Sequence, residues 1–75
     1  MAVVLHLFKS APSDLARATI TEQLRQGDRV TLVVLEGAGA NVDGPAGVTV
    51  RRVPDDLSYD TLLETMFEAD QVIAW

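Results

Sequence analysis

Two segments that are apolar on both faces constrain the fold of this chain more than any other feature. They are VVLHLF (Val3–Phe8) and DRVTLVVLE (Asp28–Glu36), and both are rich in β-branched residues. A strand that is apolar on both faces lies inside a sheet covered on both sides, or inside an interface. We therefore expect two buried strands in the first half of the chain.

The segment between these strands predicts an amphipathic helix from about Pro12 or Ser13 to Gln26. Ser10 or Ser13 can cap its start, and Gly27 stands where a left-handed C-terminal cap is expected. Strand, helix and strand joined by short links predict a right-handed parallel β-α-β unit. The residues on the helix face with 3.6-residue spacing are Leu15, Ala16, Thr19, Ile20 and Leu24.

The second half predicts a shorter strand at 48–53, a helix that Ser58 caps, and a final strand that ends on Trp75. Two arginines at the end of the 48–53 strand are typical of a sheet edge. The complete order, β-α-β-β-α-β, predicts one small α/β domain over residues 1–75, with a mainly parallel four-stranded sheet and two helices. The apolar face of the second helix comprises Tyr59, Leu62, Leu63, Met66 and Phe67.

Four of the five glycines lie in EGAGANVDGPAG (Glu36–Gly47), between the second and third strands. A dinucleotide fingerprint needs Gly-x-Gly-x-x-Gly after the first strand and at the start of a helix. Here position 42 is valine, and no helical pattern follows. If the flanking strands are parallel, the segment replaces a crossover helix and leaves one sheet face without a helix; if they are antiparallel, it is an oversized hairpin. We favour the parallel arrangement because both strands have a buried character.

Composition excludes several functions. The chain has no cysteine, which removes disulfides, thiolate nucleophiles and cysteine-bound metals, and its single histidine cannot build a typical zinc site. We therefore expect no cofactor. A net charge of −5 repels phosphate backbones, so we expect no nucleic acid as a partner. No apolar run is long enough to span a membrane, and the N-terminus lacks the pattern of a signal peptide, so we expect a cytoplasmic protein.

One candidate site lies at the carboxyl ends of the strands, where open α/β sheets bind ligands beside helix N-termini. A small molecule or an anion could bind there, and the alternative is a turn with a surface salt bridge. His6 lies inside a strand, and we expect it to be a hydrogen-bonded structural residue. The candidate ligand-binding residues are Lys9, Ser10, Ser13, Glu36 and Gly37.

A second candidate site is an assembly surface around the second helix. Its outer row, Asp60, Glu64 and Glu68, has no lysine at i+4. Such a row is either a solvated face or a contact for a basic partner surface. The single tryptophan either anchors an interface or closes the core of its own chain. The candidate interface residues are Arg52, Tyr59, Met66, Phe67 and Trp75.

Three segments also resemble a known family. LHLFKSAPSD and QGDRVTLVVLEGAG resemble the opening of DsrH/TusB proteins, in the DsrE/DsrF/DsrH-like superfamily. The end, SYDTLLETMFEADQVIAW, is similar to their last helix and strand. The chain is shorter than those proteins, mainly at the glycine-rich segment, and it lacks the cysteine that some DsrH-type members carry. The resemblance implies a single DsrH/TusB-like α/β domain over residues 1–75.

The function implied by this resemblance is a place in a sulfur-relay assembly. Members of the family act in tRNA 2-thiolation or sulfur oxidation, as hetero-hexamers or homo-oligomers. Their sulfur is carried on a cysteine of the DsrE/TusD-type subunit. A cysteine-free chain is then expected to be a non-catalytic subunit that pairs with itself or with DsrE/DsrF-like subunits. Two alternatives stay open: a module that binds a small molecule or an anion, and an enzyme completed across a dimer, although no catalytic constellation is recognisable.

Overall fold

The computed structural model describes residues 2–35 and 46–75. Its elements follow the predicted order β-α-β-β-α-β, with boundaries within a few residues of those expected. They are β1 (Val3–Phe8), α1 (Asp14–Arg25), β2 (Arg29–Val34), β3 (Thr49–Arg52), α2 (Tyr59–Glu68) and β4 (Gln71–Ala74).

The four strands form one sheet in the order β3-β2-β1-β4, and every neighbouring pair is parallel. The strands on either side of the glycine-rich segment, β2 and β3, are therefore parallel, as we favoured. The two strands that are apolar on both faces, β1 and β2, occupy the centre of the sheet. The strand that ends in two arginines, β3, lies at one edge, and β4 lies at the other.

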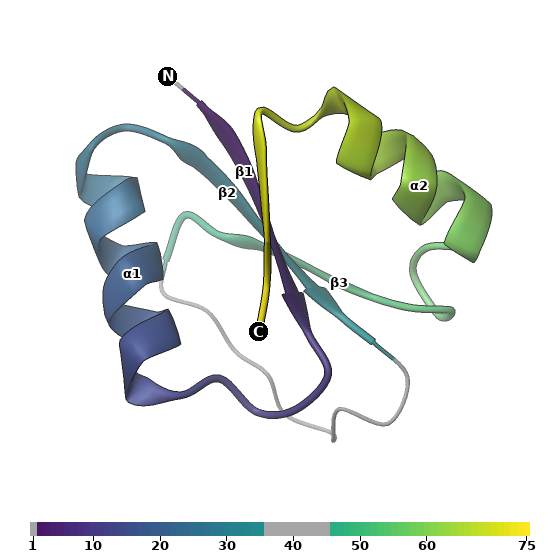
Figure 1. Cartoon of the computed structure of the whole chain (residues 1–75), viewed down its shortest axis with the longest axis horizontal. Helices are drawn as coiled ribbons and strands as arrows, with labels where there is room; N and C mark the ends of the chain where they lie inside the picture. Colours follow the sequence, from purple (N-terminus) through teal and green to yellow (C-terminus); the bar gives the residue numbers. More distant parts are fainter. Residues whose placement is uncertain (1, 36–45) are drawn as a thin grey trace.

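The two helices cover opposite faces of the sheet. Figure 1 looks onto the β4 edge, with α1 on the left of the sheet and α2 on the right. The expectation that one face would lack a helix is wrong. The reason is topological. In the strand order β3-β2-β1-β4, the connection through α1 runs from β1 to β2 in one direction, whereas the connection through α2 runs from β3 to β4 in the opposite direction. Right-handed crossovers in opposite directions place their helices on opposite faces.

Each face of the sheet has its own apolar core. Alternate residues of a strand point to opposite faces, so His6 and Phe8 face α1 while Leu5 and Leu7 face α2. Full burial of each large apolar side chain contributes about 1.5–3 kcal/mol. The buried residues on the α1 side are Phe8, Ala16, Ile20, Val30 and Leu32. Those on the α2 side are Leu5, Val33, Val53 and Leu62.

Both helix starts are capped by serine. The Ser13 Oγ accepts a hydrogen bond from the Ala16 N–H at 3.1 Å, and the Ser58 Oγ accepts one from the Thr61 N–H at 3.2 Å. At the other end of α1, Gly27 has a φ of +85°, the left-handed conformation expected for a glycine just past a helix. Local sequence thus determines where the helices begin and where α1 ends.

Candidate functional site

A hollow of about 150 Å³ lies at the carboxyl ends of β1, β2 and β4. The crossovers on the two sides of β1 run in opposite directions, so this is the point in the sheet where α/β proteins bind ligands. Four apolar residues and one lysine line it. The residues that line it are Leu7, Lys9, Leu35, Ala74 and Trp75.

The structure brings one of the predicted ligand-binding residues to this hollow, Lys9. The Ser13 hydroxyl is engaged as the cap of α1, and Ser10 is exposed and does not line the hollow. Glu36 and Gly37 lie outside the described residues. The prediction placed Lys9 at this end of the sheet, where the structure has the hollow, but it did not include the apolar residues that line it. Residues that directly follow a parallel strand lie at this end of the sheet, so the positions of Leu35 and Trp75 could have indicated these lining residues.

The chemistry that the hollow can support is binding. Lys9 supplies one positive charge, and the other lining side chains carry no titratable group. A small anion with an apolar body matches this lining, because it can meet an ammonium group at one end and aliphatic or indole surface elsewhere. Within residues 2–35 and 46–75, no three His, Asp or Glu side chains are grouped so that they could hold a metal ion.

His6 is fully buried, and both of its ring nitrogens are hydrogen-bonded. The Trp75 Nε1–H donates to His6 Nδ1 at 2.8 Å, and His6 Nε2 lies 2.6 Å from Gln23 Oε1. An indole N–H can only donate, so Nδ1 is the acceptor and the ring proton lies on Nε2, which donates to Gln23. The prediction that His6 is a hydrogen-bonded structural residue is confirmed, and its bonds join β1, α1 and the end of β4.

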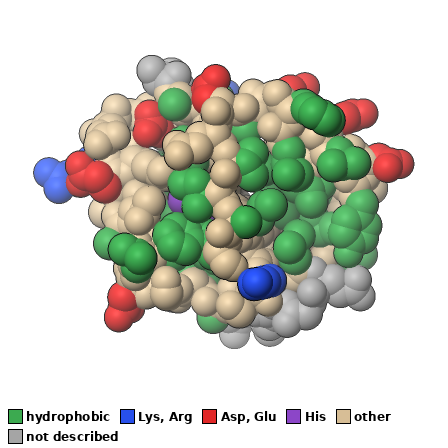
Figure 2. Space-filling view, viewed as in Figure 1, with side chains coloured by type: hydrophobic (Ala, Val, Ile, Leu, Met, Phe, Trp, Pro, Cys, Tyr) green, Lys and Arg blue, Asp and Glu red, His purple; other side chains and the backbone are tan. Residues whose placement is uncertain are grey.

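The exposed side of α2 carries a row of large apolar residues, which we call the α2 row: Tyr59, Leu63 and Phe67. They are 54%, 54% and 88% exposed, respectively, and their spacing of four residues places them along one side of the helix. Val72 of β4 is a further exposed apolar residue, at 37%. In Figure 2, hydrophobic side chains gather over α2 and beside β4, with acidic side chains around the rim. The sequence placed Leu63 on the apolar face of this helix but not among the interface candidates, and it did not single out Val72.

The remaining interface candidates have other surroundings. Met66 is half-buried and packs against the core on the α2 side. Arg52 lies on β3, at the opposite edge of the sheet from β4, and its backbone N–H donates to Asp56 Oδ2 at 2.9 Å. Trp75 is half-buried and hydrogen-bonded to His6 within its own chain. Whether any of the five candidates contacts a partner stays a prediction.

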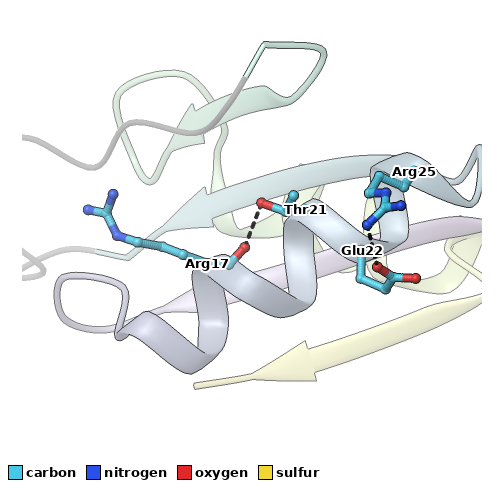
Figure 3. Close-up of polar contacts among 4 residues, drawn as sticks. All are labelled: Arg17, Thr21, Glu22 and Arg25. Carbon is cyan, nitrogen blue, oxygen red and sulfur yellow. Dashed lines mark hydrogen bonds and ion pairs between the residues drawn. The ribbon is translucent and has the colours of Figure 1, made fainter.

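The outer surface of α1 carries polar side chains that interact locally. Figure 3 shows Thr21, whose Oγ1 donates to the Arg17 carbonyl at 3.0 Å, and the Arg25–Glu22 ion pair at 3.6 Å. An exposed pair of this kind contributes at most about 1 kcal/mol. These contacts are those of an ordinary solvated helix surface, and α1 therefore offers a control surface for tests on α2.

No family model matches the chain, and no significant similarity to a curated protein or to a solved structure was found. Neither α1 nor α2, nor any other described segment, forms a helix long and apolar enough to cross a bilayer.

Proposed function

We propose that this chain is a non-catalytic, DsrH/TusB-like subunit whose function is to assemble with other subunits. The observation that carries the proposal is the α2 row, with Phe67 88% exposed. The largest contiguous apolar patch of a soluble monomer typically covers about 300–600 Å², and such a patch is often a functional interaction site. The resemblance of the first and last segments to DsrH/TusB proteins suggests which type of assembly the chain joins.

The role that fits a cysteine-free subunit is to position the chains that carry sulfur. A persulfide is held on a thiolate sulfur, and this chain has no cysteine. We propose a sulfur relay for tRNA 2-thiolation or sulfur oxidation as the process, and DsrE/DsrF-like subunits or further copies of the chain as partners, in the cytoplasm. A domain of 75 residues buries a small core, so association would also contribute to its stability.

Mixing the chain with purified, cysteine-bearing DsrE/DsrF-like subunits tests this function. We expect one complex by size-exclusion chromatography with light scattering, and sulfur label from a persulfide donor only on the partner. Phe67→Ala should weaken the complex at least tenfold, because it removes the most exposed apolar side chain of the α2 row. Leu15→Ala, at a residue 69% exposed on α1, is the matched control. Separate elution of the unmutated proteins, or stable labelling of this chain, would contradict the proposal.

A second function, a module that binds a small molecule or an anion, is favoured by the hollow beside Lys9. Trp75 lines this hollow and is the only tryptophan, so its fluorescence reports directly on occupancy. We expect small aromatic or branched carboxylates to change that fluorescence. Lys9→Met should abolish the response, because methionine has a side chain of similar length but no charge. A response that Lys9→Met leaves unchanged would show that the hollow is not the binding site.

A further inference from the structure

The outer edge of β4 is not paired with any strand that the structure describes. Among the described residues, β4 has β1 on one side and no neighbour on the other. The Trp75 N–H points inward, since it donates to the Leu7 carbonyl at 2.9 Å. Backbone groups alternate in direction along a strand, so the N–H and C=O of Val72 and Ala74 point away from the sheet. Two residues of β4 therefore present backbone donors and acceptors to an additional strand.

The two edges of the sheet are protected differently. Natural sheet edges are blunted by charged residues, which discourage a further strand from pairing. The β3 edge follows this rule, because its sequence TVRR includes two arginines. The β4 sequence, QVIA, contains no charged residue and no proline. Of the two edges, β4 is the one that can accept another strand.

The α2 row extends this edge into a larger apolar surface. Val72 pairs with Leu5, which packs against Leu62 of α2, so Val72 points to the α2 side of the sheet. Figure 2 views the molecule from the β4 edge and shows hydrophobic side chains on both α2 and β4. Full burial of an aromatic side chain covers about 150–250 Å², so the α2 row and Val72 together offer about 400 Å². That is about half of what one partner buries in a standard interface, and the β4 edge adds to it.

We propose that the β4 edge and the α2 row form a two-fold interface with a second copy of this chain, an inference that rests on the proposed assembly role. The two β4 strands pair antiparallel, so that the sheet continues from one copy into the other. The register that uses all the outward backbone groups places Val72 opposite Ala74 of the second copy, and Ile73 opposite itself. A two-fold axis perpendicular to the sheet keeps both α2 helices on one face, where the two α2 rows meet across the axis.

The uncharged centre of this surface allows a second copy to be the occupant. The α2 row and β4 carry no charged side chain, so self-pairing brings no like charges together at the centre of the contact. The acidic residues of α2, Asp60, Glu64 and Glu68, lie beyond the α2 row on the helix surface. Two copies with a net charge of −5 each still repel one another at a distance. Added salt screens this repulsion and should strengthen self-association, whereas it would weaken binding to a basic partner.

Sedimentation equilibrium at low and high salt tests the interface. We expect the chain to reach twice its 8.1 kDa mass, more completely at 0.5 M than at 0.05 M sodium chloride. Val72→Lys on the edge and Phe67→Arg on the α2 row should each raise the dissociation constant at least tenfold. Leu15→Arg, an equally drastic change at an exposed residue of α1, should leave it unchanged. Circular dichroism of each variant confirms that it is folded.

A cross-link tests the register. Because the chain has no cysteine, Ile73→Cys introduces a single thiol. The proposed register places this thiol beside the thiol of the same residue in the second copy. Directly opposed residues of antiparallel strands are about 4.5–5.5 Å apart, within the range that a disulfide can bridge. Mild oxidation should give a covalent dimer from Ile73→Cys and none from Thr21→Cys on the outer surface of α1. Equal cross-linking of the two variants would overturn the register.

The possible failures are distinguishable. A chain that stays monomeric at high salt, or a dimer that neither Val72→Lys nor Phe67→Arg weakens, overturns this interface. If the chain gives either of these results but still co-elutes with cysteine-bearing subunits, the proposed function stands and only the two-fold interface is wrong. Conversely, a dimer that both variants disrupt but that binds no such subunit supports the interface and overturns the role in sulfur relay.

Discussion

At the scale of single residues, the unusual feature is a buried histidine whose partners come from distant parts of the chain. His6 is hydrogen-bonded to Gln23 on α1 and to Trp75 after β4. The rings of His6 and Trp75 lie within 10° of parallel, so the indole N–H approaches Nδ1 close to the plane of the imidazole. One polar side chain thereby fixes how a helix and an edge strand sit against the central strand. A buried polar group has this effect only while it is fully paired.

Trp75→Phe tests the importance of that pairing. Phenylalanine retains an aromatic ring but has no N–H, so it leaves His6 Nδ1 without its donor. We expect the free energy of unfolding to fall by about 1–3 kcal/mol, the cost of an unsatisfied buried acceptor. Urea unfolding followed by circular dichroism measures it. In a His6→Leu background no acceptor remains, so the same substitution should cost distinctly less; an equal cost in both backgrounds would assign the effect to packing alone.

At the scale of helices and strands, local sequence patterns account for most of the fold. The spacing of apolar residues predicted all six elements, and the two-sided apolar pattern of β1 and β2 predicted their central places. The helix faces were less predictable, because periodicity shows that a stripe is apolar but not how much of it a neighbouring element covers. On α2 the sheet buries Leu62 and leaves Leu63 and Phe67 exposed. Of the predicted ligand-binding residues, Lys9 lines the hollow, whereas the Ser13 hydroxyl caps α1.

The two serines before α1 give a prediction at this scale. Sequence left Ser10 and Ser13 as alternative caps, and the structure selects Ser13, whose Oγ accepts from the Ala16 N–H. Ser13→Ala should lower the free energy of unfolding by about 1 kcal/mol, the usual cost of losing a cap. Ser10→Ala, at an exposed residue outside the helix, should change it by less than about 0.5 kcal/mol. Urea unfolding of both variants makes the comparison, and equal effects would contradict the assignment of the cap.

At the scale of the whole molecule, the two sides of the sheet are unequal. The α1 side holds Phe8, Ile20 and the pair His6 and Trp75, whereas on the α2 side much of the apolar surface remains exposed. A chain of 75 residues has little stability to spare. Burying the α2 row against another chain would therefore stabilise the fold and also remove exposed apolar side chains from water. For such a protein, folding and association are linked equilibria.

That linkage gives a prediction that does not depend on separating monomer from dimer. If the α2 row is buried in a complex of copies, the urea concentration at the midpoint of unfolding should rise with protein concentration, because mass action favours the associated state. Phe67→Arg should abolish this dependence. Because Phe67 is 88% exposed in the single chain, the variant should unfold at the midpoint that the unmutated chain approaches at high dilution. Circular dichroism over a hundredfold range of protein concentration makes the measurement, with Leu15→Arg expected to keep the dependence. A midpoint that is independent of concentration in the unmutated chain would show that its stability comes from the single domain alone.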